Sequence, residues 1–467
     1  MWENKKEKSG QGPGAGPRKA LAGLLWLALW QAGAAAVGNG LLLPGPVDTA
    51  LALAGLAVTG EFYINIGWTL FRCIFAVMLS FAAGIICAGA AGKWSLARSI
   101  FSLPVAFFKA VPVMAIVIYV ILLAASDWVA VIVCFFMCFP IVYTNILGGI
   151  DSMPGEYLEV AKVYRMSRWQ IVKLIYGPGI LPQIKSAVSL VSGLSWKAVV
   201  AAEVLSIPKH SLGYEMINAK YYLETANLFA YIAVIVVISL AFEKLVTFAV
   251  KGMEWKSYQG SRISSASKRA DYAAAAPSVQ CANLSKSFEN KLALDDFNIS
   301  FPAGKVTALM GPSGQGKTTL ARIISSLETA DGGKVNFSER SKISFLFQED
   351  RLLPWLNIYD NIALAQGGAE CSARIRALAE HLEIEDMLWQ LPAALSGGMK
   401  HRAALARTFI ADSNLLILDE PFRGLDEKLK GRIVNRLWEA ETAGKTVILI
   451  THNPEDAEKL ADGAMEM

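Results

Sequence analysis

The chain has 467 residues, of which 54% are hydrophobic, and its mean hydropathy is +0.39. It is too long for one ordinary core and too apolar to be wholly water-soluble, so at least one part is expected in lipid. The net charge of +4 includes no long basic run, and nothing calls for a nucleic-acid partner. The six cysteines show neither metal-ligand spacing nor a disulfide framework, so cysteine chemistry is not expected to be the function: Cys73, Cys87, Cys134, Cys138, Cys281 and Cys371.

Six apolar segments approach the length needed to cross a hydrocarbon core of ~30 Å. They lie near 20–38, 67–91, 101–124, 128–149, 180–204 and 226–250. Basic residues precede the first segment and follow the second and fourth, which predicts that these flanks are cytoplasmic. The segments 39–66 and 204–226 have few basic residues and are expected to face outward. The pattern predicts a cytoplasmic tail over 1–19 and an all-α membrane domain with six transmembrane helices over 20–255.

The first apolar segment has a second interpretation. Its basic leader, its Leu- and Trp-rich run and the small residues Ala34 to Ala36 also fit a cleaved signal peptide. Removing it would leave five spans with the C-terminus still in the cytoplasm, so topology does not decide between the two. The preference for a retained helix rests on the family resemblance described below.

The composition changes after Trp255. A tract rich in Ser, Ala and charged residues over 256–277 is typical of a linker. From 278 to 467, short apolar runs such as Val306 to Met310 and Val447 to Ile450 alternate with helical periods. This alternation predicts an α/β domain with a mostly parallel sheet.

A glycine-rich loop follows the apolar run that ends at Met310. Its glycines would let backbone N–H groups surround phosphates at the start of a helix, as expected for ATP binding. Lys317 is predicted to bind the β- and γ-phosphates, and Thr318 to ligate Mg²⁺. A chance glycine loop is the weaker alternative when this segment is taken alone. The predicted ATP-binding residues here are Gly311, Pro312, Ser313, Gly314, Gln315, Gly316, Lys317, Thr318 and Thr319.

Two adjacent carboxylates end the apolar run Leu415 to Leu418. Asp419 is suited to Mg²⁺ and Glu420 to polarising the attacking water. Acidic pairs at strand ends often only cap the next helix. That alternative does not account for the pair's combination with the glycine-rich loop.

The segment Ser396, Gly397, Gly398 and Met399 gives the third pattern, since a Ser and two glycines before a helical run present open donors at a positive helix end. With it, this half resembles the ATPases of ABC transporters. The resemblance implies that Ser396 to Met399 contact ATP held by the opposite subunit, and therefore that two copies of the chain form a dimer. It also implies roles for Phe288 in adenine stacking, Gln348 in the Q-loop as a catalytic and metal-binding residue, Asp426 in the D-loop and His452 in catalysis.

Some of these assignments have simpler alternatives. Phe288 could be plain strand core, and a lone His is more often structural. The other histidines, His210, His381 and His401, are interpreted as surface or loop residues. The chain departs from the family pattern at Lys400-His401-Arg402 and at Arg423-Gly424-Leu425. These departures remove no phosphate or metal ligand, but they leave the rate of hydrolysis open.

An amphipathic helix is predicted in the cytoplasmic loop over 150–178. It resembles the coupling loop of binding-protein-dependent importers, with Glu159, Ala161 and Tyr164 as the coupling residues. The alternative is a solvated helix that only joins two spans. Arg165 occupies the position where the family usually has Gly. If that Gly adopts a positive φ, Arg165 is expected to be strained or the loop to be reshaped.

Four charged residues fall within or near the spans: Lys109, Lys185, Lys197 and Glu203. Such groups are costly in lipid unless they face a bundle interior or a wet path. Lys197 and Glu203 are six positions apart and face different sides of a helix, so a direct pair is not implied. A contact between Lys197 and an anionic substrate and a structural pairing both remain open.

The membrane half also resembles the taurine, sulfonate and nitrate permeases through Leu43 to Pro46, Trp196 to Glu203 and Leu212 to Tyr214. The resemblance implies ATP-driven import of a small anionic solute across the cytoplasmic membrane. The partners implied are a second copy of the chain and a separate extracytoplasmic binding protein. An ABC exporter half-transporter is the alternative. A membrane signalling machine is disfavoured because the longest outward segment is too short for a sensor domain.

Overall fold

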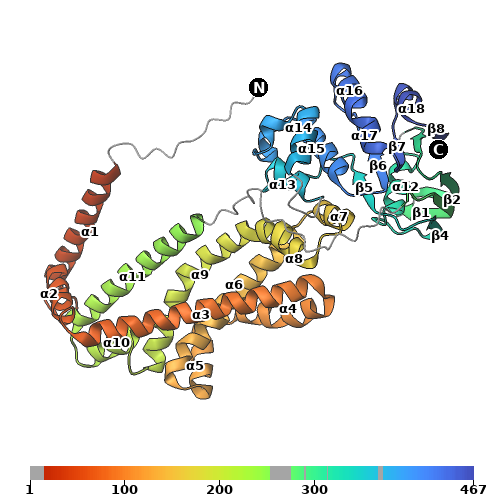
Figure 1. Ribbon diagram of the computed structural model, residues 1–467. Coiled ribbons are helices and arrows are strands. Elements are labelled where there is room, and N and C mark those ends of the chain that lie inside the picture. The colour runs from red at the N-terminus through yellow and green to blue at the C-terminus, as the bar shows by residue number, and fades with distance from the viewer. Residues whose placement is uncertain (1–14, 253–274, 289–290, 313, 366–371) are drawn as a thin grey trace. The chain divides into compact units, whose positions relative to one another are not determined.

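A computed structural model describes residues 15–252, 275–288, 291–312, 314–365 and 372–467 (Figure 1). Most of the expected tail 1–19 and linker 256–277 lies outside the described residues, as do Ser313 and Cys371. The chain divides into two compact units. The helical unit comprises Met1–Ser152 and Ile180–Glu254, and the α/β unit comprises Met153–Gly179 and Trp255–Met467.

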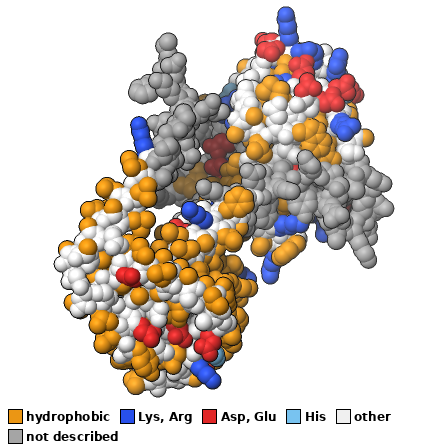
Figure 2. All heavy atoms as spheres, turned by 90° about the vertical axis from the view of Figure 1, so that its left-hand side faces the viewer, with side chains coloured by type: hydrophobic (Ala, Val, Ile, Leu, Met, Phe, Trp, Pro, Cys, Tyr) orange, Lys and Arg blue, Asp and Glu red, His pale blue; other side chains and the backbone are white. Residues whose placement is uncertain are grey.

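Long apolar helices build the helical unit. Apolar side chains cover much of their surface, as Figure 2 shows for one face of the molecule. A helix that is hydrophobic all round is typical of a protein core or a membrane span. The helices are α1 (Ala15–Val37), α2 (Pro46–Leu56), α3 (Gly60–Lys93), α4 (Ser95–Ala110), α5 (Val113–Leu123), α6 (Ser126–Asp151), α9 (Gly177–Ser206, in this unit from Ile180), α10 (Leu212–Tyr221) and α11 (Thr225–Lys251).

The helices α3 and α6 pack closely at Gly84. A Cβ at this position would lie 2.5 Å from Cγ1 of Val142 on α6, so only glycine fits. Small residues permit such close approach between membrane helices, where packing rather than hydrophobicity holds helices together.

Four helical segments are long and apolar enough to span a membrane: Gly60–Lys93, Ser126–Asp151, Arg168–Ser206 and Thr225–Val250. The third expected span is instead two helices, α4 and α5, bent by 110°. Pro112 precedes α5, and a proline disfavours helical geometry in the residue before it, which explains the break. With the bent pair counted as one, the described residues offer five spans rather than the expected six.

The remaining expected span corresponds to α1, which has 23 residues over Ala15–Val37 and is apolar over Leu21–Val37. The segment 39–66, expected only to connect two spans, contains α2 and the first turns of α3. The outward segment 204–226 likewise contains α10. Both connections therefore contain helices.

Two sheets form the frame of the α/β unit. The parallel sheet has the order β5-β6-β7-β3-β8, and an antiparallel sheet has the order β2-β1-β4. The strands are β1 (Val279–Phe288), β2 (Lys291–Phe301), β3 (Val306–Met310), β4 (Gly332–Phe337), β5 (Ile343–Leu346), β6 (Leu415–Asp419), β7 (Thr446–Ile450) and β8 (Gly463–Glu466). The predicted α/β fold with a parallel sheet is confirmed, and its strands β6 and β7 are completely buried.

Short helices accompany these strands in the α/β unit. The α-helices are α7 (Gly155–Val163), α8 (Arg168–Ile171), α12 (Lys317–Ile324), α13 (Ile358–Ala363), α14 (Ser372–His381), α15 (Gly397–Ile410), α16 (Glu427–Ile433), α17 (Glu439–Thr442) and α18 (Pro454–Leu460). Single turns of π-helix occupy Val172–Tyr176 and Val434–Trp438, and 3₁₀ turns occupy Glu385–Met387 and Pro392–Ala394.

The segment 153–179 packs as part of the α/β unit. Val160 of α7 is fully buried in one core cluster with Leu320 and Ile324 of α12. Ala161 is buried in a second cluster with Leu353 and Leu356. A helix whose apolar face is covered in this way does not agree with the alternative of a solvated connection.

Candidate functional site

The glycine-rich loop joins β3 to α12 through backbone conformations that favour glycine. Gly314 and Gly316 have φ angles of 87° and 94°, in the left-handed region. A Cβ at Gly316 would lie 2.4 Å from the carbonyl oxygen of Ala293. The loop can therefore keep its backbone close to β2 and deliver N–H groups to the start of α12, where anions bind.

A pocket of about 390 Å³ lies at this loop, within the size range of small-molecule sites. It brings together most of the predicted ATP-site residues from four strand ends and the start of α12. Gly311, Pro312 and Gln315 belong to the loop without lining the pocket, and Ser313 is outside the described residues. The lining residues are Phe288, Ala293, Gly314, Gly316, Lys317, Thr318, Thr319, Gln348, Asp419, Glu420, Ile450 and His452.

Lys317 is 5% exposed and donates from Nζ to the carbonyl oxygens of Gly311, at 2.8 Å, and Pro312, at 2.6 Å. Burial lowers the pKa of Lys317, although Asp419 and Glu420 act in the opposite direction. A buried ammonium held by neutral carbonyls alone gains from an anionic partner. The loop thus holds a cation suited to a phosphate.

Asp419 ends β6 and is 2% exposed. Its Oδ2 accepts a hydrogen bond of 3.0 Å from Oγ1 of Thr318. Burial raises the pKa of Asp419, and the hydrogen bond from Thr318 only partly opposes this effect. A divalent cation would stabilise the charged form of this carboxylate.

Hydroxyl and carboxylate oxygens are the ligands that Mg²⁺ prefers, and Mg²⁺ usually takes one or two carboxylates plus phosphate oxygens. Thr318 and Asp419 fit that requirement, and the exposed Gln348 lines the same pocket after β5. Within the described residues, no group of three or more His, Cys, Asp and Glu could hold a metal by itself. The residues present fit a cation that shares its ligands with a nucleotide.

Glu420 follows Asp419 with a φ of 53°, which is uncommon for a residue other than glycine. Its backbone N–H donates to the carbonyl oxygen of Ile450 at 3.0 Å. Its Oε1 lies 3.3 Å from Nε2 of His452, which follows β7. Backbone strain of this kind gathers at functional sites, and both Glu420 and His452 line the pocket.

The segment Ser396 to Met399 and Asp426 of the D-loop do not line this pocket. Ser396 caps α15, where its Oγ accepts from the N–H of Met399 at 3.4 Å. Gly397 and Gly398 form the first turn of that helix. Asp426 caps α16 by accepting from the N–H of Leu429 at 2.8 Å. Their action on ATP of the opposite subunit stays a prediction.

The interpretation of His401 as a surface or loop residue is wrong. His401 lies on α15, is 5% exposed and contacts Oδ1 of Asp350 and the carbonyl oxygen of Pro421, both at 3.1 Å. It joins the segment after Gln348 to the segment after Glu420. His401 precedes the buried Leu405 of α15 by four positions, and this spacing, which places both on one helical face, was the sequence signal for burial. His210 is exposed, and His381 ends α14.

Glu159 of α7 contacts two arginines that belong to the elements of the nucleotide pocket. Arg322 of α12 donates to its carboxylate at 2.6 and 2.9 Å, and Arg351 forms a second ion pair three residues after Gln348. Burial disfavours the ionised carboxylate, but the hydrogen bonds from Arg322 and Arg351 outweigh burial and lower the pKa of Glu159. Sequence reasoning identified Glu159 and missed both arginines, which belong to no motif.

The rest of the segment is also anchored. The guanidinium of Arg407 lies 5.7 Å from the ring centre of Tyr164. Nε1 of Trp355 donates to the carbonyl oxygen of Leu174 at 2.7 Å. Arg165 adopts a φ of 49° and donates from Nη2 to the carbonyl oxygen of Ser341 at 2.7 Å. Arg165 is therefore strained, which is one of the two outcomes expected at this position.

In the helical unit, Glu203 is completely buried and pairs with Arg72 of α3 at 3.0 Å. Its Oε2 also accepts from Oγ1 of Thr69 at 3.0 Å and from the N–H of Gly213 at 3.3 Å. Sequence reasoning missed Arg72, which is inside the second predicted span. Lys109 and Lys197 are exposed and Lys185 is half-buried.

Two family models match the chain. The binding-protein-dependent transport system inner membrane component matches residues 51–254, and the ABC transporter model matches residues 294–423. An aliphatic sulfonates import ATP-binding protein of Streptomyces avermitilis is 37% identical over 189 residues, covering 40% of this chain and 75% of that protein. The chain belongs to the ABC transporter family. It fuses a binding-protein-dependent membrane component to an ABC ATPase domain, as the sequence resemblance indicated.

A sulfate/thiosulfate import ATP-binding protein of Neisseria meningitidis is 38% identical over 211 residues, covering 41% of this chain. This ABC transporter chain spans 58% of the length of that relative. A solved dimeric ATP-binding cassette, in a post-hydrolysis state bound to ADP and Pi, is 28% identical with a TM-score of 0.38. That comparison covers 40% of this chain and 94% of the solved one.

Proposed function

We propose that this protein imports a small anionic solute across the cytoplasmic membrane, driven by hydrolysis of Mg²⁺-bound ATP. It works as a homodimer and receives the solute from a separate extracytoplasmic binding protein. Support for the direction and solute class comes from relatives named for import of sulfate, thiosulfate and aliphatic sulfonates. The membrane component of binding-protein-dependent type supports the need for a binding protein.

The observation that carries this proposal is the double ion pair of Glu159. Its partner Arg322 lies on α12, the helix that begins with Lys317, and its partner Arg351 follows Gln348. In sequence, α7 stands between the spans that end at Asp151 and begin at Arg168. A movement of either ATP-site element would therefore pull on the connection between two spans, which is a two-state coupling device.

Within the pocket, Lys317 would bind the β- and γ-phosphates, and Thr318 and Asp419 would hold Mg²⁺, which neutralises charge on the phosphates. Glu420 would orient and polarise the attacking water, with His452 beside it. Phe288 is 44% exposed and lines the pocket, with Nζ of Lys286 5.1 Å from the ring centre. That placement suits stacking on adenine.

A mixed-dimer experiment tests the shared ATP sites. Lys317→Ala and Ser396→Arg chains, each expected to be inactive alone, are co-expressed with different tags and purified as heterodimers. If each site uses Lys317 of one chain and Ser396 of the other, the heterodimer keeps one intact site and regains ATPase activity. A heterodimer as inactive as either parent would show that each chain builds its own site.

Direction is tested in proteoliposomes with the α/β unit outside. The binding protein loaded with taurine, sulfate or an aliphatic sulfonate is trapped in the lumen. ATP added outside should raise hydrolysis and move the solute into the external medium. Solute accumulating in the lumen without any binding protein would favour the exporter and overturn the import proposal.

A further inference from the structure

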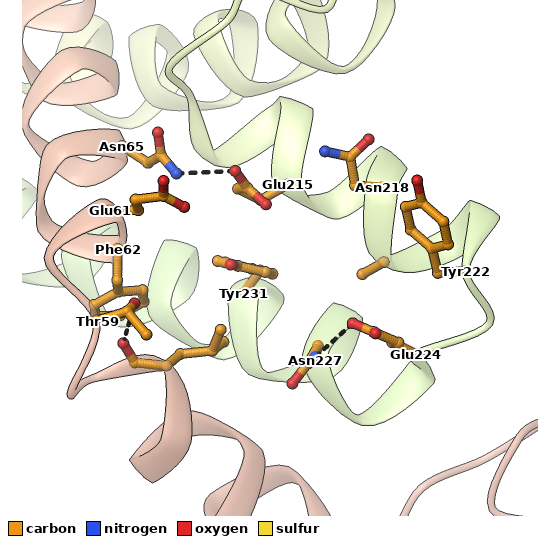
Figure 3. Close-up of a pocket in the computed structure, with 12 residues that line it drawn as sticks. Thr59, Glu61, Phe62, Asn65, Glu215, Asn218, Tyr222, Glu224, Asn227 and Tyr231 are labelled. Atoms are coloured by element: carbon orange, nitrogen blue, oxygen red, sulfur yellow. Dashed lines mark hydrogen bonds between the residues drawn. The ribbon is translucent and has the colours of Figure 1, made fainter.

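The helical unit has a pocket of about 310 Å³, and four of the polar side chains that line it are paired with one another (Figure 3). Nδ2 of Asn65 donates to Oε1 of Glu215 at 3.0 Å, and Nδ2 of Asn227 donates to Oε2 of Glu224 at 2.7 Å. These side chains are engaged with each other, so the pocket points to no ligand. A buried charge that is held by neutral groups lies instead in the α/β unit, at Arg407.

Arg407 lies on α15 and is 1% exposed. Its Nη1 donates to the carbonyl oxygen of Arg351 at 2.9 Å, and its Nη2 to that of Asp350 at 2.7 Å. Its Nε is buried and has no hydrogen-bond partner among the described residues. Burying a cation among neutral groups costs free energy, which an apolar side chain of similar size would not cost. The stability of the fold therefore does not explain this arginine, and a buried group of this kind calls for another explanation.

The contacts of Arg407 join two elements that serve ATP. The two carbonyl oxygens belong to the segment that follows Gln348, which lines the ATP pocket. The helix that carries Arg407 begins with its cap at Ser396. A second contact runs beside the first, because Nδ1 of His401 on α15 lies 3.1 Å from Oδ1 of Asp350. Side chains of α15 thus hold the segment after Gln348 within one chain.

These contacts gain importance in the homodimer proposed above, on which this inference rests. In that dimer, Ser396 would contact ATP held by the opposite subunit, whereas Gln348 lines the pocket of its own subunit. ATP in the opposite pocket would fix the start of α15. The helix would in turn fix the carbonyl oxygens of Asp350 and Arg351, and with them the segment that carries Gln348.

We propose that Arg407 couples the two ATP sites of the dimer. It is a positioning residue through which ATP bound at one site orders Gln348 at the other, so that the second ATP binds more tightly. His401 supports the same connection through Asp350. Coupling between two sites typically changes affinity about 5- to 150-fold. Hydrogen bonds from a charged donor are roughly twice as strong as neutral ones, so the two bonds of Arg407 can carry such an effect.

The test is the ATP dependence of hydrolysis by the full chain in phosphatidylcholine nanodiscs. The wild type should show a Hill coefficient between about 1.5 and the limit of about 2 that two sites allow. Arg407→Met should lower the coefficient to about 1 and raise the half-saturating ATP concentration about fivefold or more. Arg407→Lys keeps the charge without the planar fork and should give an intermediate coefficient. Arg376→Met, an exposed change on α14, is the matched control and should behave as the wild type does.

His401→Leu provides a second variant, which keeps the test decisive if Arg407→Met does not fold, and it should lower the Hill coefficient too. Thermal unfolding shows which variants are folded. A merely structural role would lower the unfolding temperature and the maximal rate and leave the coefficient unchanged. The proposal is overturned if the wild type hydrolyses ATP with a coefficient of about 1, or if the folded variants keep the wild-type coefficient. Either result would leave the import proposal standing, whereas a wild type that hydrolyses no ATP would contradict the proposed function itself.

Discussion

The two units place their charged groups in different ways. In the α/β unit, Asp419 and His452 stand at strand ends and Lys317 begins α12, each within a short motif, and all three line one pocket. In the helical unit, Arg72 and Glu203 are 131 positions apart and belong to no shared motif, yet they form a completely buried pair. Chemistry at strand ends is therefore encoded locally, whereas the partners of polar groups between membrane helices depend on packing.

The largest expected effect is that of Lys317→Ala. Truncating one partner of a desolvated charge pair costs roughly 2–5 kcal/mol, so ATP affinity should fall about 30-fold to several thousand-fold. Nucleotide binding is measured with a fluorescent ATP analogue, and hydrolysis by phosphate release. Lys334→Ala, an exposed lysine on β4, is the matched control and should bind as the wild type does. Equal affinity for ATP in both variants would remove Lys317 from the site.

Glu420→Gln is expected to affect rate and not affinity. The amide keeps the size of the side chain but cannot polarise water, and positioned acid–base groups typically contribute about 10²–10⁴-fold. Hydrolysis should therefore fall by at least 100-fold while ATP binding is retained. If the Gln variant hydrolysed ATP at the wild-type rate, the role would pass to His452 or Gln348.

In the helical unit, Arg72→Met should leave Glu203 buried without its cation. Removing one member of a buried ion pair lowers the free energy of unfolding by about 3–5 kcal/mol, whereas neutralising both members lowers it far less. The double variant Arg72→Met with Glu203→Gln should therefore unfold at a higher temperature than Arg72→Met alone, because Gln still accepts from Thr69 and Gly213. Lys109→Met, which changes an exposed lysine, is the control. Thermal unfolding in detergent measures the unfolding temperature of each variant. A double variant that unfolds at a lower temperature than Arg72→Met would contradict this prediction.

The sequence predicted the α/β half well because its signals are local. A strand, a glycine turn and a helix start occur together around Lys317, and the acidic pair directly follows an apolar run. The phosphate pocket and the parallel sheet could be read from these segments alone. The resemblance also marked Arg165 as a position where strain or a reshaped loop was expected, and this residue adopts a positive φ.

Less could be predicted for the helical half, because hydropathy indicates how long an apolar segment is and not where its helix bends. It could not separate a straight span from the pair α4 and α5, which have the same composition as one span. Partners such as Arg72 with Glu203, or Glu159 with Arg351, depend on which faces meet in the folded chain. Their spacing carries no period or motif from which the contact could be predicted.

A smaller effect is expected at the contact between α7 and the nucleotide-site elements. A double-mutant cycle of Glu159→Gln with Arg351→Gln should give a coupling energy of about 0.5–3 kcal/mol, measured by thermal unfolding of the full chain. The pKa of Glu159 is lowered, so its stabilising contribution is fully present above the unfolded value of about 4.3 and is lost as pH falls through the lowered value. The coupling should thus be constant from pH 8 to pH 5. A coupling energy near zero at pH 7 would show that the pair does not hold the segment.

The smallest effect concerns Arg165, where two contributions oppose each other. A left-handed conformation costs a residue with a Cβ roughly 1–2 kcal/mol, and here a hydrogen bond to the carbonyl oxygen of Ser341 offsets part of that cost. Arg165→Ala would lose the hydrogen bond and keep the strain, whereas Arg165→Gly would lose both. The Gly variant should therefore be more stable than the Ala variant by about 1 kcal/mol, although glycine usually destabilises a fold relative to alanine. Chemical unfolding of the two variants measures the difference, and an Ala variant as stable as the Gly variant would mean that the loop relaxes to a negative φ once the arginine is removed.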